Sequence, residues 1–378
     1  MRAKGSWLTA PGTQAVMAAL EGGGHRALAV GGCVRNALLG VPVADVDLAT
    51  DARPEEVAAL AEGAGLKAVP TGIAHGTVTV VADGAGYEVT TFRRDVATDG
   101  RHAVVAFSGD VAEDAARRDF TMNALYAARD GAVVDPIGGL PDLLARRVRF
   151  VGDADARVRE DYLRILRFFR FHAWYADPEG GIDADGLAAC ARGADGLARL
   201  SAERISGEMR RLLAAPDPAP AVAAMAAAGV LARVMPGAEA AALGPLVHAE
   251  GAAPPDWRRR AVALGGRTDD WRLSRADARA LEVRRAALEA GTPVHEVAYR
   301  QGAEAARDVA LLRAAAAGAA AELAGIEGAA AARLPIRAAD LPLEGPALGA
   351  ALRRAEAAWI ASGFALGRDA LRAAALSD

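Results

Sequence analysis

The sequence of 378 residues contains little lysine and little cysteine. Lys4 and Lys67 are the only lysines among 44 basic residues, so arginine carries nearly all of the positive charge. The two cysteines, Cys33 and Cys190, lie far apart and show no metal-ligand spacing. A disulfide framework is therefore excluded, and a cysteine-based zinc site is not expected.

Long hydrophobic segments are also missing from the sequence. No apolar run reaches the roughly 20 residues that a membrane-spanning helix needs. The N-terminal segment MRAKGSWLTAPGTQ lacks the apolar core of a secretory signal peptide. We therefore expect a globular protein of the cytoplasm that has no membrane partner.

The charge of the chain is uneven along the sequence. A formal net charge of −4 does not by itself indicate nucleic-acid binding, and a GC-rich genome accounts for the overall preference for arginine. It does not account for clustering: residues 146–170 hold eight arginines against four acidic residues, and residues 258–285 hold nine against four. Local basic patches of this kind are typical of proteins that contact phosphates at chosen places.

The pattern of apolar residues changes at about residue 140. Before it, short β-branched segments (26–32, 44–50, 77–81 and 87–92) alternate with helical spacing (33–40, 53–65 and 113–128). After it, only helical patterns follow, among them 140–152 and 155–175. The sequence predicts an α+β fold with a small mixed head, followed by an all-α body and tail.

Two aspartates, Asp45 and Asp47, fall in the predicted strand 44–50. Residues two apart on a strand point to the same face, so their carboxylates repel each other unless a cation lies between them. Mg²⁺ prefers oxygen ligands and commonly binds one or two carboxylates with substrate phosphates, as in two-metal phosphoryl-transfer sites. Glu88, on the strand 87–92, is the candidate third acid. The ordinary alternatives are a solvated Asp-x-Asp turn and an exposed strand glutamate.

A glycine pair precedes these aspartates. Gly31 and Gly32 follow an apolar strand and open a helix, so the backbone can approach a ligand closely and offer free N–H groups to an anion. Arg35 lies in the first turns of that helix and could reach the same phosphates. The arrangement predicts a triphosphate on the turn beside metals held by the two aspartates.

At this point the chain resembles the polymerase-β-like nucleotidyltransferases that comprise class II CCA-adding enzymes and bacterial poly(A) polymerases. The resemblance covers residues 28–171 and consists of five motifs in the order of the family: LAVGGCVRNALLGVPVADVDLAT, YEVTTFRRD, DGRHAVVAF, EDAARRDFTMNAL and EDYLRILRFFRF. One departure is visible, because the family usually has Asp where this chain has Asn36. Asn keeps the size and an acceptor oxygen but loses the charge.

The resemblance implies roles for two further motifs. In RRDFTMNAL, expected to be helical, Arg118, Asp119 and Asn123 would contact the sugar and phosphates of the nucleotide; a surface helix with ion pairs is the alternative.

In EDYLRILRFF, Asp161 and Arg164 are i,i+3 neighbours on an expected helix. Their acceptor and donors match the amino group and ring nitrogen of cytosine and adenine but not of guanine or uracil. An ordinary surface ion pair is the alternative for this pair.

The remaining expectations concern a fourth nucleotide-binding arginine, a loop and a basic segment. Arg167 lies three residues after Arg164 and is expected to bind nucleotide. The family's flexible loop corresponds to DVATDGRHAVVAF, with Asp99, Arg101 and His102 as its candidate residues. Residues 257–279 are the best candidate for a surface that contacts the tRNA backbone, although its tryptophans are more typical of a core.

The resemblance implies a CCA-adding tRNA nucleotidyltransferase that uses CTP, ATP and two Mg²⁺ ions and acts on tRNA without a template. It also implies a catalytic head (1–140), a base-recognising neck (141–205) and a tRNA-binding body and tail (206–378). Three alternatives remain: a poly(A) polymerase, an enzyme that adds only C or only A, and an RNA-binding protein without catalysis on the same scaffold. A nucleotidyltransferase acting on small molecules would not need the base-recognising helix or the long basic body.

Overall fold

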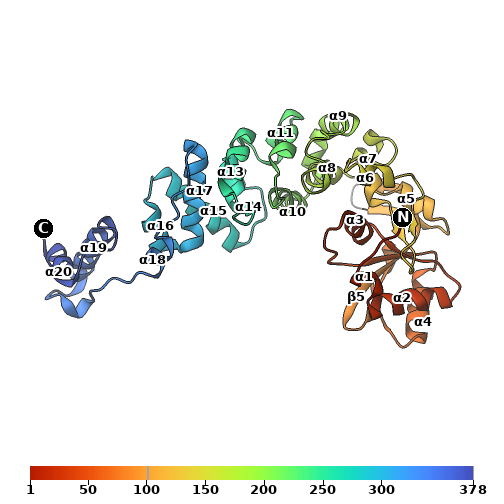
Figure 1. Ribbon diagram of the computed structural model, residues 1–378, viewed down its shortest axis with the longest axis horizontal. Coiled ribbons are helices and arrows are strands. Elements are labelled where there is room, and N and C mark those ends of the chain that lie inside the picture. Colours follow the sequence, from red (N-terminus) through yellow and green to blue (C-terminus); the bar gives the residue numbers. More distant parts are fainter. Residues whose placement is uncertain (100–101, 378) are drawn as a thin grey trace. The chain divides into compact units, whose positions relative to one another are not determined.

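The computed structural model describes residues 1–99 and 102–377 and has two compact units, Met1–Val234 and Met235–Asp378. Within the described part of the chain, all strands lie in the first unit, and the second is built from helices (Figure 1). The predicted α+β head followed by an all-helical region is therefore confirmed. Each unit is described by itself below.

The first unit is organised around a mixed sheet of seven strands in the order β3-β4-β5-β2-β1-β8-β9. Strands β2 and β5 pair in parallel, and the other neighbours are antiparallel. A separate hairpin consists of β6 and β7. The strands are β1 (Ala27–Val30), β2 (Asp47–Thr50), β3 (Lys67–Gly72), β4 (Thr77–Ala82), β5 (Ala85–Thr91), β6 (Arg93–Asp99), β7 (His102–Phe107), β8 (Tyr126–Ala127) and β9 (Val133–Val134).

Helices surround this sheet and continue beyond it within the first unit. They are α1 (Ser6–Thr9), α2 (Pro11–Gly22), α3 (Gly32–Leu39), α4 (Pro54–Gly63), η1 (Ile73–His75), α5 (Val111–Ala116), η2 (Thr121–Asn123), α6 (Leu140–Leu144), α7 (Ala154–Glu160), α8 (Leu163–Tyr175), α9 (Ala184–Gly193), η3 (Ala194–Arg199), α10 (Ala202–Leu213), α11 (Ala219–Ala227) and α12 (Leu231–Val234).

One face of β4 and β5 is covered and the other is open. Burial alternates along both strands, as a half-buried sheet requires, and the buried set includes Val80 and Val89. Helices α2 and α4 pack on the sheet here and bury Met17 and Val57. Each such apolar side chain contributes about 1.5–3 kcal/mol by leaving water. Glu88 points to the opposite face and is exposed.

Two predicted helices are shorter than the apolar spacing indicates. The segment 113–128 is helical only to Ala116, and then forms a turn, η2 and β8. Here the carboxylate of Asp119 accepts a hydrogen bond from the backbone N–H of Phe120, a local bond that competes with helix continuation. The predicted helix 140–152 ends at Leu144, after which Phe150 forms a β-bridge with Phe120.

The predicted helix 155–175 is interrupted at Asp161, which separates α7 from α8. Asp161 has an extended backbone (φ −153°, ψ 107°), and its Oδ1 accepts from the backbone N–H of Leu163 at 3.0 Å. The side chain thus satisfies a donor at the start of α8 in the manner of a helix cap. Residues 161 and 164 are therefore not i,i+3 neighbours on one helix.

A group of phenylalanines connects α8 to the sheet side of the first unit. Phe120 lies 4.8 Å from Phe171 and 5.0 Å from Phe150, measured between ring centroids, and Phe150 stacks on Phe168 at 5.3 Å. All four rings are at most 2% exposed. Packing of this density fixes α8 against the segment that carries Asp119.

All regular secondary structure in the described part of the second unit is helical. It consists of η4 (Ala240–Ala242), α13 (Leu243–Glu250), α14 (Trp257–Leu264), α15 (Arg275–Glu289), α16 (Val294–Gln301), α17 (Ala303–Ala317), α18 (Ile326–Ala331), η5 (Ala338–Asp340), α19 (Gly345–Ala361) and α20 (Arg368–Leu376). Among the helices described in either unit, none combines the length and the apolar character needed to span a membrane.

Candidate active site

Carboxylates from two neighbouring strands meet on the open face of the sheet. Asp47 and Glu88 are register partners in the parallel pair β2–β5, so their side chains project side by side. Asp45 lies in the segment before β2, because the strand begins at Asp47 and not at residue 44 as predicted. All three residues are exposed to solvent.

Of the three carboxylates, Asp47 is affected by its neighbours. The pKa of Asp47 is raised, first by partial loss of hydration and then by the negative charges of Glu88 and Asp45, while Arg118 acts in the opposite direction. None of the described side chains forms a hydrogen bond or ion pair with these three carboxylates. A cation would relieve the repulsion between them.

The residues present fit a magnesium ion that shares its ligands with a substrate. No group of three His, Cys, Asp or Glu side chains in the described ranges is arranged to hold a metal by protein ligands alone. Mg²⁺ does not require such a cage, since it is usually held by one or two carboxylates, substrate phosphates and water. Asp45 and Asp47 match that pattern.

The glycine turn between β1 and α3 lies beside Arg118. Gly31 has φ 70° and ψ −118°, a conformation that L side chains rarely adopt, and its N–H donates to the carbonyl of Leu125 at 3.1 Å. A Cβ atom on Gly31 would lie 3.5 Å from Nη1 of Arg118. The turn and the RRDFTMNAL motif, some 90 positions apart in the sequence, therefore meet as the resemblance implies.

Arg118 is held by two buried partners that the sequence did not single out. Its Nη2 donates to Asp114 at 2.8 Å and its Nε to the hydroxyl of Tyr126 at 3.0 Å; that hydroxyl itself donates to Asp114 at 2.7 Å. Burial opposes ionisation of Asp114, but the charges of Arg118 and Arg117 outweigh it and lower the pKa of Asp114. The only signal of this in the sequence is that Asp114 and Arg118 lie one helical turn apart.

Arg35 is buried, with 6% of its surface exposed. Its Nη1 donates to Asn123 Oδ1 at 2.6 Å, and its Nε and Nη2 donate to Asn36 Oδ1 at 3.1 and 2.9 Å. Burial lowers the pKa of the guanidinium. This geometry does not support the predicted direct contact of Arg35 with phosphates, because neutral acceptors of the protein already occupy its donors.

Asn36, the position at which the chain departs from the family pattern, uses both ends of its amide. While Oδ1 accepts from Arg35, Nδ2 donates to the carbonyl of Pro42 at 3.0 Å. A carboxylate has no donor for that carbonyl. The amide therefore links Arg35 to the segment that leads to Asp45.

Asp119, Asn123 and Arg167 form one hydrogen-bonded group around the buried Asp119, although not on one helix. The prediction that Asp119 and Asn123 face one way as i,i+4 helical neighbours is wrong in its geometry, since only Asn123 lies in η2. The two are nevertheless bonded, Asn123 Nδ2 to Asp119 Oδ1 at 3.1 Å. Arg167 Nε donates to Asp119 Oδ2 at 2.7 Å, and despite burial its charge and hydrogen bonds lower the pKa of Asp119.

Asp161 and Arg164, predicted to lie side by side, have different partners. Asp161 Oδ2 accepts from Arg204 Nη2 at 2.6 Å. Arg164 pairs with Glu160 and donates to the carbonyl of Arg117 at 3.0 Å. The helical interruption at Asp161 is the reason, and Arg164 instead connects α8 to the RRDFTMNAL segment.

The segment predicted as a flexible loop contains the hairpin β6–β7. Asp99 and His102 are register partners at its end, while Arg101 lies outside the described residues. Alternating β-branched and small residues on both sides of Asp99-Gly-Arg are consistent with a hairpin.

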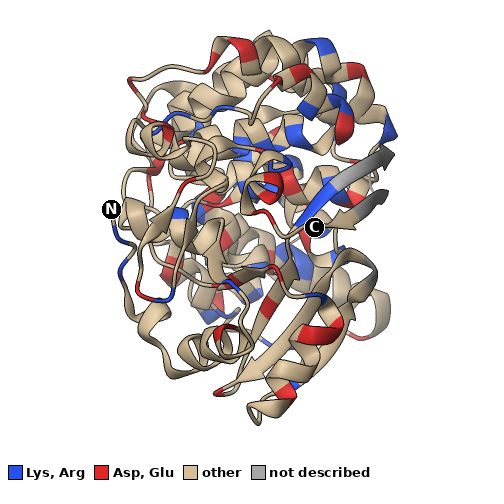
Figure 2. Ribbon diagram, turned by 90° about the vertical axis from the view of Figure 1, so that its right-hand side faces the viewer, with Lys and Arg blue, Asp and Glu red and all other residues tan. Residues whose placement is uncertain are grey.

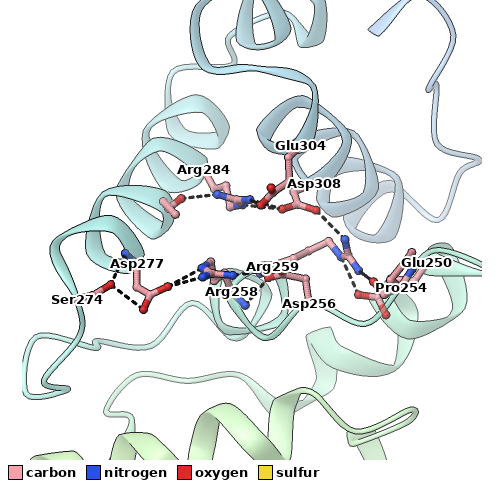
Figure 3. A network of polar contacts seen from close by, with 11 residues as sticks. Glu250, Pro254, Asp256, Arg258, Arg259, Ser274, Asp277, Arg284, Glu304 and Asp308 are labelled. Atoms are coloured by element: carbon pink, nitrogen blue, oxygen red, sulfur yellow. Dashed lines mark hydrogen bonds and ion pairs between the residues drawn. The ribbon is translucent and has the colours of Figure 1, made fainter. Parts of the chain in front are cut away.

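The basic segment 257–279, predicted to contact the tRNA backbone, is divided between the interior and the surface of the second unit. Arg259 and Arg260 are 5% and 1% exposed, and both pair with Glu250; Arg259 also donates to Asp308 at 2.7 Å (Figure 3). Trp257 and Trp271 are buried, as is typical of core tryptophans. Figure 2 shows that acidic and basic residues are also interspersed along helices of the first unit. The exposed arginines of the segment are Arg267, Arg272, Arg275 and Arg279.

Comparison with known proteins places these features in a family context. Residues 27–149 match the family described as "Poly A polymerase head domain", and residues 181–242 match "Probable RNA and SrmB- binding site of polymerase A". The chain is 45% identical over 190 residues to CCA tRNA nucleotidyltransferase 1, mitochondrial, of Mus musculus, covering 50% of this chain but 44% of that protein. It is 40% identical over 257 residues to the CCA-adding enzyme of Geobacillus thermodenitrificans, covering 66% of this chain and 58% of that protein.

Solved structures extend the similarity along the chain. A structure of Bacillus stearothermophilus CCA-adding enzyme in complex with CTP matches with a TM-score of 0.70 at 30% identity, covering 96% of this chain and 90% of that one. A structure of Thermotoga maritima CCA-adding enzyme complexed with tRNA matches with a TM-score of 0.68 at 17% identity, which shows similarity of fold. In sequence, the chain spans about half the length of the mammalian relative that it matches.

Proposed function

This chain belongs to the family of class II CCA-adding enzymes and bacterial poly(A) polymerases, and we propose that it adds C, C and A to the 3′ end of tRNA from CTP and ATP. One observation supports this most: Asp47 and Glu88 project together from adjacent strands, with Asp45 close by and the glycine turn beside Arg118. The similarity to the CTP complex covers nearly the whole chain, which supports the same substrate class here.

The chemistry that we propose is nucleotidyl transfer. The 3′ hydroxyl of the tRNA attacks the α-phosphate of the bound nucleotide, a phosphodiester bond forms, and pyrophosphate leaves. The backbone N–H of Gly32, at the start of α3, would face the triphosphate, while the N–H of Gly31 holds the turn against Leu125. Arg118, whose positive charge is secured by Asp114, would lie beside it and stabilise the charge that develops on the leaving group.

Asp45 and Asp47 would hold magnesium, with Glu88 as the third acid of the site. When bound, two such ions neutralise phosphate charge and increase the acidity of the attacking hydroxyl. The carboxylates are suited to this because they are exposed, adjacent and without other partners among the described residues. The raised pKa of Asp47 follows from that adjacency.

We infer that Asp161 and Arg164 select the base, with Arg167 supporting them through Asp119. Arg164 donors can meet the ring nitrogen of cytosine or adenine, and an Asp161 oxygen can accept from the amino group. Asp161 must then share or exchange its contact with Arg204 when a nucleotide binds, and Arg164 must do the same with Glu160 and the carbonyl of Arg117. Arg164→Ala should relax discrimination against UTP and GTP roughly tenfold or more while magnesium dependence persists, and unchanged selectivity would refute the role.

The remaining assignments are proposals about the larger molecule. We propose a catalytic head over 1–140, a base-recognising neck over 141–205 and a tRNA-binding body and tail over 206–378. The match of residues 181–242 to an RNA-binding family supports RNA contact from the end of the neck onward. Action in the cytoplasm stays a prediction.

The decisive experiment uses three tRNA substrates, ending at the discriminator base, at C and at CC. Each is incubated with CTP, with ATP or with both, and products are resolved to single nucleotides. A CCA-adding enzyme completes all three and stops after A. Long adenylate tails would indicate a poly(A) polymerase, arrest after CC or failure before it would indicate a partial activity, and tRNA binding without incorporation would indicate a scaffold without catalysis.

A further inference from the structure

A continuous chain of hydrogen bonds runs from the segment before the catalytic aspartates to the end of α8. It starts at the carbonyl of Pro42, which accepts from Asn36, and continues from Asn36 Oδ1 to Arg35. Arg35 Nη2 then donates to the hydroxyl of Tyr175 at 2.8 Å. Tyr175 is the last residue of α8, the helix that carries Arg164 and lies far from Arg35 in the sequence.

A second branch leaves the same guanidinium. Arg35 Nη1 donates to Asn123 Oδ1 at 2.6 Å, Asn123 donates to Asp119 at 3.1 Å, and Asp119 accepts from Arg167 Nε at 2.7 Å. Arg167 lies near the middle of α8. The guanidinium of Arg35 is therefore connected to α8 at two points along the helix.

Stacking and burial make this junction stiff. The guanidinium carbon of Arg35 lies 4.0 Å from the centre of the Tyr175 ring and 5.0 Å from that of Phe171. Because Arg35 is buried, its hydrogen bonds act in a medium of low dielectric constant, where they are stronger than in water. A planar guanidinium holds its donors in fixed directions, so it fixes the positions of its hydrogen-bond partners more closely than a flexible ammonium group does.

We propose that Tyr175 is a positioning residue for nucleotide selection, acting through Arg35. Arg35 and Tyr175 together fix the distance between the glycine turn, where the triphosphate rests, and α8, where the base is read. One nucleotide must satisfy both places at once, and a misplacement of about 1 Å can cost on the order of 100-fold in rate. The inference rests on the proposed function, and it assigns a task to a residue outside the five sequence motifs.

The test compares Tyr175→Phe with the unchanged full-length chain. Phenylalanine keeps the stacked ring and removes the hydroxyl that Arg35 bonds. Steady-state kcat and KM are measured for ATP and GTP on tRNA ending in CC, and for CTP and UTP on tRNA ending at the discriminator base. We expect the ratio of kcat/KM for ATP over GTP, and for CTP over UTP, to fall about tenfold, the size expected for one hydrogen bond to a charged group.

The control is Tyr299→Phe, which makes the same chemical change in the second unit. It removes a hydroxyl that donates to Glu356, within the second unit, at 2.9 Å. Its selectivity ratios should stay within twofold of the unchanged chain. Thermal unfolding of both variants separates a loss of stability, which lowers the active fraction, from a change in selectivity, which does not depend on that fraction.

A double variant tests whether Tyr175 acts through Arg35. Arg35→Lys keeps the charge but cannot hold all of the acceptors, so it should lose selectivity on its own. Tyr175→Phe added to Arg35→Lys should cause little further loss, because the shared contact is already broken. Fully additive losses, or unchanged ratios in Tyr175→Phe, would overturn the inference. If the unchanged chain adds no C or A to any tRNA, the proposed function itself fails, which is a separate result.

Discussion

Buried arginines appear in both units, but their partners differ. In the first unit, Arg35 is surrounded by the neutral acceptors of Asn36, Asn123 and Tyr175. In the second, Arg259 lies between the carboxylates of Glu250 and Asp308, and Arg284 pairs with the same Asp308 (Figure 3). Both arginines are buried. The charge of Arg35 has no carboxylate partner among its hydrogen bonds, whereas the charge of Arg259 is offset by two carboxylates.

This difference separates a functional site from a structural one. The network of the second unit neutralises itself and joins α13, α14, α15 and α17, so its role is to fix helices. In the first unit, within the ranges that the structure describes, no carboxylate hydrogen-bonds to Arg35, and no cation pairs with Asp47 or Glu88. Asp47 and Glu88 thus face solvent as unpaired carboxylates, which metal ions bound with a nucleotide would balance, whereas Arg35 is held in the interior by neutral partners.

The largest effect is expected from removing a carboxylate that faces the substrate. Asp47→Ala should reduce nucleotide incorporation by about 1,000-fold or more, equivalent to roughly 4 kcal/mol of transition-state stabilisation. The measurement is single-turnover incorporation of CTP with saturating tRNA and magnesium. Binding of tRNA, measured by fluorescence anisotropy, should change less than twofold, because Asp47 is not placed in an RNA contact. Parallel loss of binding and of incorporation would point to misfolding and count against the assigned role.

Breaking the balanced network should instead cost stability. Asp308→Ala leaves Arg259 and Arg284 without a shared buried carboxylate, and we expect the free energy of unfolding to fall by about 3–5 kcal/mol. The measurement is urea denaturation followed by far-UV circular dichroism. Asp195→Ala is the matched control: its partner Arg233 and its own carboxylate are exposed, so it should cost less than about 1 kcal/mol. Equal losses in the two variants would show that burial does not distinguish these pairs.

The sequence predicted the sheet residues of the site well and their helical neighbours poorly. Asp47, Glu88 and Gly31 were found because strand alternation and a glycine turn leave local patterns in the sequence. Asp161 was placed on a helix because apolar spacing continues through it, whereas its own side chain caps α8 and interrupts the pattern. Local hydrogen bonds of this kind compete with helix continuation and leave no periodic signal.

Charge clusters did not distinguish the buried arginines from the exposed ones. The arginines of residues 258–285 suggested a phosphate-binding surface, but their acidic partners Glu250 and Asp308 lie outside that window and were not counted with them. Tyr175 was missed for a related reason, since its partner Arg35 is distant in the sequence. Contacts between distant segments determine whether an arginine is balanced, and without an alignment or a structure such contacts are not visible.

The exposed arginines of the second unit allow a milder test of RNA binding. Arg275 and Arg279 are i,i+4 neighbours on α15 and exposed. If both contact phosphates, the double substitution to alanine should weaken tRNA binding about tenfold at low salt and reduce the slope of log K against log salt by roughly 1.4–1.8. Glu289→Gln on the same helix is the control and should not weaken binding. An unchanged salt dependence would exclude both arginines from the RNA interface.

The smallest expected effect concerns the stability cost of the unbalanced carboxylates. Because the folded-state pKa of Asp47 is raised, folding favours its protonated form, and its contribution to stability is lost as the pH rises through that pKa. Asp47→Asn should therefore stabilise the unliganded protein at neutral pH, by about 0.5 kcal/mol at most since the residue is exposed. The gain should shrink as the pH is lowered from 8 towards the ordinary aspartate value of about 4, and urea midpoints across this range would measure it.

Asp114→Asn should behave in the opposite way, because the pKa of Asp114 is lowered by Arg118 and Arg117 despite its burial, so that its charge stabilises the fold above the unfolded-state value. If Asp47→Asn destabilised the protein at neutral pH, the carboxylate of Asp47 would have a structural partner. The difference drawn between unpaired carboxylates in the first unit and paired ones in the second would then be wrong.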